Sequence, residues 1–472
     1  MKKIHITFLL LLCTTLGFSQ DITGIWNGII SLEQGKQIVF VFNIEALESK
    51  LITTIDIPSN RVTGLKPKAT HFDKDSLYID GSNLGIKFQG KLNRTTHQIE
   101  GTFTEGVNAL PLLLKREKIN IDKKVTRPQE PVKPYPYYEE DVVFENNEAN
   151  ITLSGTLTLP KKAGKFPVVV LISGSGPQDR DETFAGHKPF LVLADYLTRK
   201  GIAVLRYDDR GFGKSSGDFS AATTKDFSTD AISAVNYLKS RTDIDSEHIG
   251  LIGHSEGGII APMVANQSPD VSFIVLMAST GILGSDISLM QSKTLRPFPV
   301  PDEAVYEQAI KKVLEIASSN KETKIVKKEL LDHYNLTIAP ILKTVVGSDE
   351  KVNQIITQFI ELRTTPWSRY FYNYNPADEF EHVKIPVLSL NGTKDTQVLA
   401  KVNQEGIRNA LIKGNNKDFK ILELENLNHF FQECTTGAMD EYNNIEQTIA
   451  PIALTEISTW ILEHTKNHMT ND

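Results

Sequence analysis

The pattern of apolar and polar positions changes in character along the chain. Between residues 20 and 118, short runs alternate apolar and polar residues and are separated by turn residues, as in Gln37–Asn43 and Gln98–Thr104. Strict alternation without a helical period indicates β-strands with one buried face. This stretch is therefore predicted to be a small all-β domain, either a barrel or a sandwich. We interpret its Trp26 as core packing rather than as part of a binding face.

From residue 139 to 472, mostly apolar runs alternate with longer amphipathic stretches. Phe166–Ile172 and Ser272–Met277 are apolar enough to be strands covered on both faces. Strands that alternate with helices predict an α/β domain with a doubly wound, mostly parallel sheet, and ligands bind such sheets at the carboxyl ends of the strands. Between about 281 and 367 the alternation gives way to helical patterns, which predicts a helical cap over the site. The alternative is a helical elaboration unrelated to access.

Two short segments complete the predicted organisation. Residues 119–138 contain four prolines between Pro128 and Pro136, which disfavour helix, so this segment is predicted to be a linker. Residues 1–19 begin with basic residues, continue through an apolar run and end in small and polar residues, the layout of a secretory signal peptide. The apolar run is too short to span a bilayer. We therefore expect a protein exported to the periplasm or the exterior, without a membrane span.

Composition narrows the range of partners. The chain has 472 residues and a formal net charge of -7, so it offers no basic surface for nucleic acid. Cleavage after the signal segment would remove Cys13 and leave Cys434 as the only cysteine, which excludes an intramolecular disulfide. His and Cys residues do not cluster with zinc-ligand spacing, so neither a metal nor another cofactor is expected. The sequence leaves the oligomeric state open.

The strongest chemical signal is Gly253–Gly257, whose sequence Gly-His-Ser-Glu-Gly fits the glycine-x-serine-x-glycine nucleophile elbow. The segment follows an apolar strand and precedes a helical pattern. At such a strand-to-helix turn the serine is held in strained backbone geometry that projects its hydroxyl from the sheet, and the glycines relieve crowding. Ser255 is therefore the candidate nucleophile. His254 is interpreted as structural packing, because adjacent residues point apart.

A serine hydroxyl needs a base and an orienting carboxylate. Asp395 follows the apolar strand Ile385–Leu390, and His429 follows the last predicted strand, Phe419–Leu424. The chain order Ser255, Asp395, His429 is the order that hydrolases of this architecture use, with each residue on a loop at a strand end. The sequence therefore predicts a catalytic triad.

The tetrahedral intermediate of acyl transfer also needs backbone N–H donors. One is expected from Glu256, the residue after the serine. The other is expected from the glycine-containing loop Ser173–Asp181, at Ser175. The charged run Asp179–Asp181 is interpreted as an ion-pair network that braces this loop.

Several of these segments together resemble one superfamily. They are Ser173–Asp181, Asp208–Gly211, Gly253–Gly258, Pro366–Phe371 and Asn391–Val398. Over residues 140–465 the chain resembles the α/β-hydrolases, and in particular bacterial serine carboxylesterases that carry an extra N-terminal domain and are related to serine aminopeptidase-like hydrolases. The resemblance implies the same triad and a helical cap. Trp367 and Tyr370, where the cap rejoins the sheet, are the candidate residues to line the acyl pocket; the alternative is that they only pack against it.

These observations predict an exported serine hydrolase that cleaves small or medium acyl esters through an acyl-enzyme on Ser255. One alternative is a peptidase or amidase that uses the same triad. A second alternative, from another class, is a non-catalytic binding protein that acts through its N-terminal β domain.

Overall fold

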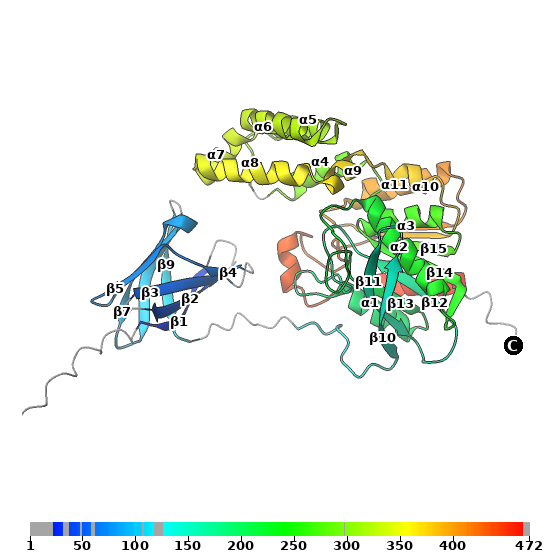
Figure 1. Ribbon diagram of the computed structural model, residues 1–472, viewed down its shortest axis with the longest axis horizontal. Coiled ribbons are helices and arrows are strands. Elements are labelled where there is room, and N and C mark those ends of the chain that lie inside the picture. Colours follow the sequence, from blue (N-terminus) through cyan, green and yellow to red (C-terminus); the bar gives the residue numbers. More distant parts are fainter. Residues whose placement is uncertain are drawn as a thin grey trace, which may run out of the picture. The chain divides into compact units, whose positions relative to one another are not determined.

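A computed structural model describes residues 22–31, 37–47, 50–57, 62–105, 108–117, 126–296 and 298–465. The expected signal peptide, residues 1–19, lies outside them. The chain forms two compact units, Met1–Lys124 and Val125–Asp472 (Figure 1). No helix within the described ranges is long and apolar enough to cross a membrane.

The first unit is a closed β-barrel. Its strands are β1 (Gly24–Ser31), β2 (Gln37–Leu47), β3 (Lys50–Ile57), β4 (Val62–Leu65), β5 (Ala69–Asp73), β6 (Ser76–Gly81), β7 (Ile86–Asn93), β8 (Gln98–Glu105) and β9 (Asn108–Lys115). The antiparallel order is β2-β1-β9-β8-β7-β6-β5-β3, and pairing of β2 with β3 closes the ring, while β4 pairs with β3. The all-β prediction is confirmed. Of the two forms that the sequence allowed, a barrel or a sandwich, the domain is a barrel.

Side chains fill the barrel. Residues along β7 alternate strictly between buried and exposed. Trp26, Phe42 and Phe88 are each at most 1% exposed, and the indole of Trp26 donates to the carbonyl of Ile22 at 2.8 Å. The interpretation of Trp26 as core packing is therefore confirmed.

The second unit is built on a mostly parallel sheet. Its strands are β10 (Tyr138–Asn146), β11 (Ile151–Leu159), β12 (Phe166–Ile172), β13 (Ala203–Tyr207), β14 (Ile244–His254), β15 (Val271–Met277), β16 (Val387–Gly392) and β17 (Phe419–Leu424). Their order is β10-β11-β13-β12-β14-β15-β16-β17, and β11 runs antiparallel to both of its neighbours. This is the α/β-hydrolase fold that the sequence predicted.

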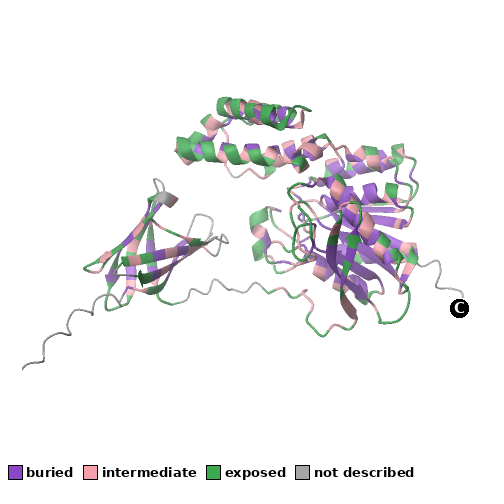
Figure 2. Ribbon diagram, in the orientation of Figure 1, coloured by how far each residue is buried: buried purple, intermediate pink, exposed green. Residues whose placement is uncertain are grey.

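Successive residues of a strand point to opposite sides of the sheet, so apolar strands give the sheet two apolar faces. Helices cover both of them. Val168 and Val170 of β12 pack in one core with α2 (Thr224–Lys239), α3 (Gly257–Gln267) and α11 (Ala400–Lys413). Val169 and Leu171 pack in the other core with α1 (Pro189–Arg199) and α12 (Pro451–Thr465). Figure 2 shows the resulting band of buried strands.

A helical insertion follows β15 and has its own apolar core (Figure 1). Its helices are α4 (Gly284–Thr294), α5 (Glu303–Ser318), α6 (Thr323–Thr337), α7 (Ala339–Val346), α8 (Asp349–Arg363) and α9 (Pro366–Asn373). A short helix, α10 (Pro376–Phe380), leads back to β16 and packs in the sheet core. We call α4–α9 the cap.

Part of the proline-rich segment belongs to the second unit. Arg127 donates to the carbonyls of Ile445, at 2.6 Å, and Ala185, at 3.2 Å. Gln129 accepts the backbone N–H of Thr448 at 2.6 Å. The segment therefore holds together the loop before α1 and the loop before α12, and the division between the two units falls before it.

Candidate active site

Ser255 stands at the turn from β14 into α3. Its φ of 52° lies in the left-handed region, and its N–H donates to the carbonyl of Met277 on the neighbouring strand at 2.8 Å. A side chain at Gly253 would run into the carbonyl of Gly257, and one at Gly257 would run into the carbonyl of Ile172. The two glycines thus permit the sharp turn. Ser255 itself is half-buried between two buried neighbours.

Asp395 and His429 meet beside this turn. The Nδ1–H of His429 donates to Oδ2 of Asp395 at 2.7 Å, and the two side chains are 4% and 0% exposed. The other carboxylate oxygen, Oδ1, accepts the backbone N–H groups of Gln397 and Val398, each at 2.8 Å. A carboxylate held in this way fixes both the orientation and the tautomer of the imidazole, which leaves Nε2 free to accept a proton.

Contacts with the elbow place His429 next to it. The ring centroids of His254 and His429 are 4.8 Å apart, and Nε2 of His254 lies 3.0 Å from the backbone carbonyl of His429. His254 is directly bonded to Ser255 in the chain. Of the three predicted triad members, Asp395 and His429 are therefore paired, and the loop of His429 is attached to the residue preceding Ser255.

The loop after β12 lies against the elbow as well. A Cβ built on Gly174 would be 3.2 Å from Cβ of Ser255. The N–H of Gly174 is bound by Glu182 at 2.8 Å, and that of Gln178 is bound by Asp209 at 2.8 Å. In the described part of the chain the Ser175 N–H has no such partner. This leaves it available as an oxyanion donor.

Charged residues brace the same loop. Arg180 pairs with Asp208 at 2.8 Å, and Asp181 pairs with Arg206. Asp179 instead accepts the backbone N–H groups of Asp181 and Thr183, at 2.9 and 3.0 Å. Arg180 and Asp181 thus form ion pairs as expected, whereas Asp179 stabilises the turn of the backbone.

Glu256, the residue after Ser255, has a buried carboxyl that joins three elements. Its Oε1 accepts the hydroxyl of Thr224 at 2.7 Å and the indole N–H of Trp367 at 2.6 Å. Burial raises the pKa of Glu256, and hydrogen bonds from Thr224, Trp367 and Ser175 offset part of this rise. Trp367, which the sequence placed in the candidate acyl pocket, therefore contacts the elbow directly through Glu256.

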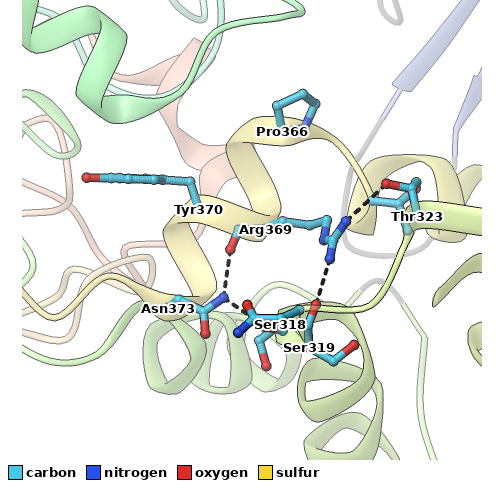
Figure 3. A pocket seen from close by; sticks show the side chains of 9 residues that line it. Ser318, Ser319, Thr323, Pro366, Arg369, Tyr370 and Asn373 are labelled. Atoms are coloured by element: carbon cyan, nitrogen blue, oxygen red, sulfur yellow. Dashed lines mark hydrogen bonds between the residues drawn. The ribbon is translucent and has the colours of Figure 1, made fainter. Parts of the chain in front are cut away.

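Tyr370, the second candidate pocket residue, lies elsewhere on α9. It lines a cavity of about 390 Å³ in the cap, shown in Figure 3. The other lining residues are Ser318, Ser319, Asn320, Thr323, Thr364, Pro366, Arg369 and Asn373. This cavity contains none of the triad residues, and Arg369 already donates to Thr323 at 3.0 Å and to the carbonyl of Ser319 at 2.6 Å. The structure therefore brings Trp367 to the elbow, whereas Tyr370 lines this cavity of the cap.

Two residues of this region were not assigned a role in catalysis from the sequence. The sequence predicts packing for His254 and no role for Glu182. Their side chains form a buried pair at 2.8 Å beside the triad. Only the fold brings position 182 to position 254, so no local pattern could have revealed the pair. Within the described ranges, groups of three or more His, Cys, Asp or Glu that could hold a metal ion are absent.

The fold and this arrangement define an α/β-hydrolase, and comparison with known proteins gives the family. Residues 150–405 match the X-Pro dipeptidyl-peptidase (S15) family, and the chain belongs to that family. It is 30% identical over 300 residues to the esterase EstD of Thermotoga maritima, and the match spans 62% of each chain.

Two further matches are weaker. The putative hydrolase YtaP of Bacillus subtilis is 32% identical over 119 residues, which cover 22% of this chain and 40% of that protein. Among solved structures, the Pyrococcus furiosus esterase Pf2001 superposes with a TM-score of 0.44 and 15% identity, covering 70% of this chain and 91% of that chain. The superfamily that the motifs indicated is confirmed by the family match over residues 150–405.

Proposed function

We propose that the protein is an exported serine esterase that acts on small or medium acyl esters. The observation that carries the proposal is the buried Asp395–His429 pair, attached to an elbow whose serine has a φ of 52°. The similarity to the esterase EstD supports an ester as the substrate. Export rests on the layout of residues 1–19.

In the proposed reaction, Nε2 of His429 takes the proton of Ser255 as Oγ attacks the ester carbonyl. Asp395 holds the Nδ1–H and stabilises the imidazolium that forms. The backbone N–H groups of Ser175 and Glu256 bind the oxyanion of the tetrahedral intermediate. His429 then returns the proton to the leaving alcohol, and water attacks the acyl-enzyme by the same route.

The family match supports a second candidate, a peptidase that releases X-Pro dipeptides. Both reactions use the same acyl-enzyme chemistry, so the triad does not separate them. They differ in the leaving group, which is an alcohol in one case and an amine in the other. The wild-type protein should be assayed with p-nitrophenyl acetate and butyrate and with an X-Pro p-nitroanilide. The esterase proposal predicts a kcat/KM at least about 100-fold higher for the esters, whereas a higher value for the anilide would favour the peptidase.

The assignment of Ser255 is tested by Ser255→Ala. The substitution removes a single half-buried oxygen and keeps a side chain that tolerates the same backbone, so the fold should survive. Ester turnover should fall by at least about 10⁴-fold, and labelling by a fluorophosphonate should disappear. Circular dichroism of the variant supplies the control for folding. A variant that keeps most of its turnover would exclude Ser255 as the nucleophile.

A further inference from the structure

Glu182 and His254 form a buried pair that the proposed reaction does not use. Oε1 of Glu182 lies 2.8 Å from Nδ1 of His254, and the two side chains are 2% and 3% exposed. Burying an acid and a base is unfavourable unless the geometry satisfies both. A pair this close to a reaction centre therefore calls for a physical explanation.

The two side chains connect the loops on either side of the nucleophile strand. Oε1 of Glu182 also accepts the N–H of Gly174 at 2.8 Å, one residue before the expected oxyanion donor Ser175. On the other side, Nε2 of His254 lies 3.0 Å from the carbonyl of His429. A continuous chain of hydrogen bonds thus runs from Gly174 through Glu182 and His254 to His429.

The partners of His254 determine its protonation. A carboxyl oxygen of Glu182 and the backbone carbonyl of His429 face its two ring nitrogens, so an imidazolium that donates to both satisfies this geometry. The ring then carries two protons and a positive charge, which Glu182 balances. Burial alone would lower the pKa of His254, but attraction to Glu182 and the hydrogen bonds to Glu182 and His429 outweigh this and raise it.

We propose that Glu182 and His254 are positioning residues that hold the oxyanion loop and the loop of His429 in register across the nucleophile strand. This inference rests on the proposed function. Within the described residues, neither side chain forms a hydrogen bond with Ser255 or with a ring nitrogen of His429. They act through the backbone of Gly174 and His429, whose placement decides whether the oxyanion donor reaches the carbonyl oxygen while the base reaches Oγ of Ser255.

Other charged groups surround the pair. Asp395, the partner of His429, also raises the pKa of His254 by electrostatic attraction. The carboxyl of Asp209 accepts the backbone N–H of Gln178 in the same loop, and burial, together with the nearby Glu256 and Glu182, raises the pKa of Asp209. The carboxyl groups of Glu182, Asp208 and Asp209 accept backbone N–H groups of the oxyanion loop, but of these only Glu182 continues to the loop of the base. This is why the test addresses Glu182 and His254 and not the acidic cluster as a whole.

The test compares Glu182→Gln, His254→Gln and the double variant with the wild type. In Glu182→Gln the amide keeps the shape of the side chain but cannot balance a charge, so His254 loses a proton and one of its two hydrogen bonds. Each single variant should lower kcat for p-nitrophenyl acetate by about 10- to 100-fold, because small displacements of catalytic groups are costly. KM should stay within about 3-fold, since substrate binding itself is unaffected. The double variant should be no worse than about 3-fold below the poorer single variant, because both act through one chain of contacts.

The same strand offers a matched control. Asp245 and His248 form an acid–imidazole pair at 2.7 Å near the beginning of β14, at the end opposite the elbow. Asp245→Asn should leave kcat and KM within about 2-fold of the wild type. Single variants of the Glu182–His254 pair that are folded by circular dichroism and keep kcat within about 2-fold would overturn the inference. So would equal losses in Asp245→Asn.

The outcome separates this inference from the proposed function. If the wild-type protein neither turns over esters nor labels at Ser255, the proposed function fails. If wild type is active, Ser255→Ala is inactive and Glu182→Gln is fully active, only the positioning role fails. Glu182→Gln preserves volume and shape, so it carries the test alone should His254→Gln not fold.

Discussion

Trp367 at the start of cap helix α9 donates its indole N–H to Glu256, the residue after Ser255, across 2.6 Å. The same carboxylate oxygen accepts the hydroxyl of Thr224 at the start of α2, at 2.7 Å. Cap, elbow and sheet-covering helix therefore meet at one buried group. Because the cap is anchored here, its base is fixed to the nucleophile turn.

Trp367→Phe should weaken this junction. The substitution keeps the aromatic ring, which stacks on Phe371 at 5.0 Å, but removes the donor to a buried carboxyl. The free energy of unfolding should fall by about 1–3 kcal/mol, the usual cost of leaving a buried acceptor without one of its partners. Urea unfolding followed by circular dichroism measures the change.

Tyr374→Phe is the matched control for that prediction. Tyr374 ends α9, and within the described residues its buried hydroxyl has no hydrogen-bond partner. Removing an unsatisfied polar atom should leave stability within about 0.5 kcal/mol or raise it. If both variants lose the same stability, the indole contact contributes nothing specific.

Asp395→Asn tests the second member of the triad. The amide replaces one of the two carboxylate oxygens by an NH2 group. The backbone N–H groups of Gln397 and Val398 keep the remaining oxygen on their side, so the NH2 group faces Nδ1 of His429, which loses its acceptor. The imidazole is then held in the wrong tautomer. We expect kcat for esters to fall by about 10³–10⁴-fold.

Steady-state assays of Asp395→Asn should be paired with Asp440→Asn. Asp440 is an exposed acid in the 3₁₀-helix Met439–Asn444 and should be replaceable without loss. Equal activity in the two variants would remove Asp395 from the mechanism.

Much of the fold could be predicted from the sequence, because it depends on local patterns. Phe166–Ile172 and Phe419–Leu424 were predicted as strands, and they are strands over these same residues. An apolar run bounded by turns fixes its own conformation. The elbow is partly local, since Gly253 is required by the carbonyl of Gly257 within the same turn, whereas Gly257 is required by the carbonyl of Ile172 on β12.

Features that depend on distant partners were not predictable. Closure of the barrel depends on the pairing of β1 with β9, in which Asn27 lies opposite Lys115, so the sequence leaves barrel and sandwich open. Arg127 contacts carbonyls near residue 445, and this contact places part of the proline-rich segment in the second unit. The Glu182–His254 pair joins residues 72 positions apart. In each case the interaction depends on tertiary contacts that leave no local pattern.

Gly257→Ala should be far more damaging than an alanine at another glycine. Its Cβ would run into the carbonyl of Ile172 on β12, a backbone atom that cannot move without the strand. We expect a loss of about 3 kcal/mol or more in the free energy of unfolding.

Gly347, which ends α7 with a φ of 67° and open space around it, is the comparison. Gly347→Ala should cost only the strain of the left-handed backbone, about 1–2 kcal/mol. Thermal and urea unfolding rank the two, and a reversed order would contradict the close approach of β12 and the elbow.

Asp209→Asn should change how stability depends on pH. Burial and the nearby Glu256 raise the pKa of Asp209 well above its ordinary value of 3.8, although the N–H of Gln178 and the hydroxyl of Ser173 oppose this. Below pH 3.8 the carboxyl is protonated in both folded and unfolded states. Above that pH the unfolded chain releases the proton while the folded protein retains it. The contribution of Asp209 to stability therefore falls as pH rises toward the folded pKa.

Asparagine has no proton to release and can keep both hydrogen bonds. The stability of wild type relative to Asp209→Asn should therefore decline from about pH 4 upward, by up to about 1.4 kcal/mol per pH unit. Urea unfolding at pH 4, 5, 6 and 7 measures this difference, and the exposed Asp440→Asn should give a constant offset over the same range. A difference between wild type and Asp209→Asn that does not vary with pH would mean that Asp209 is ionised in the folded protein throughout. The oxyanion loop would then be held by a full negative charge at Gln178, and not by a neutral carboxyl.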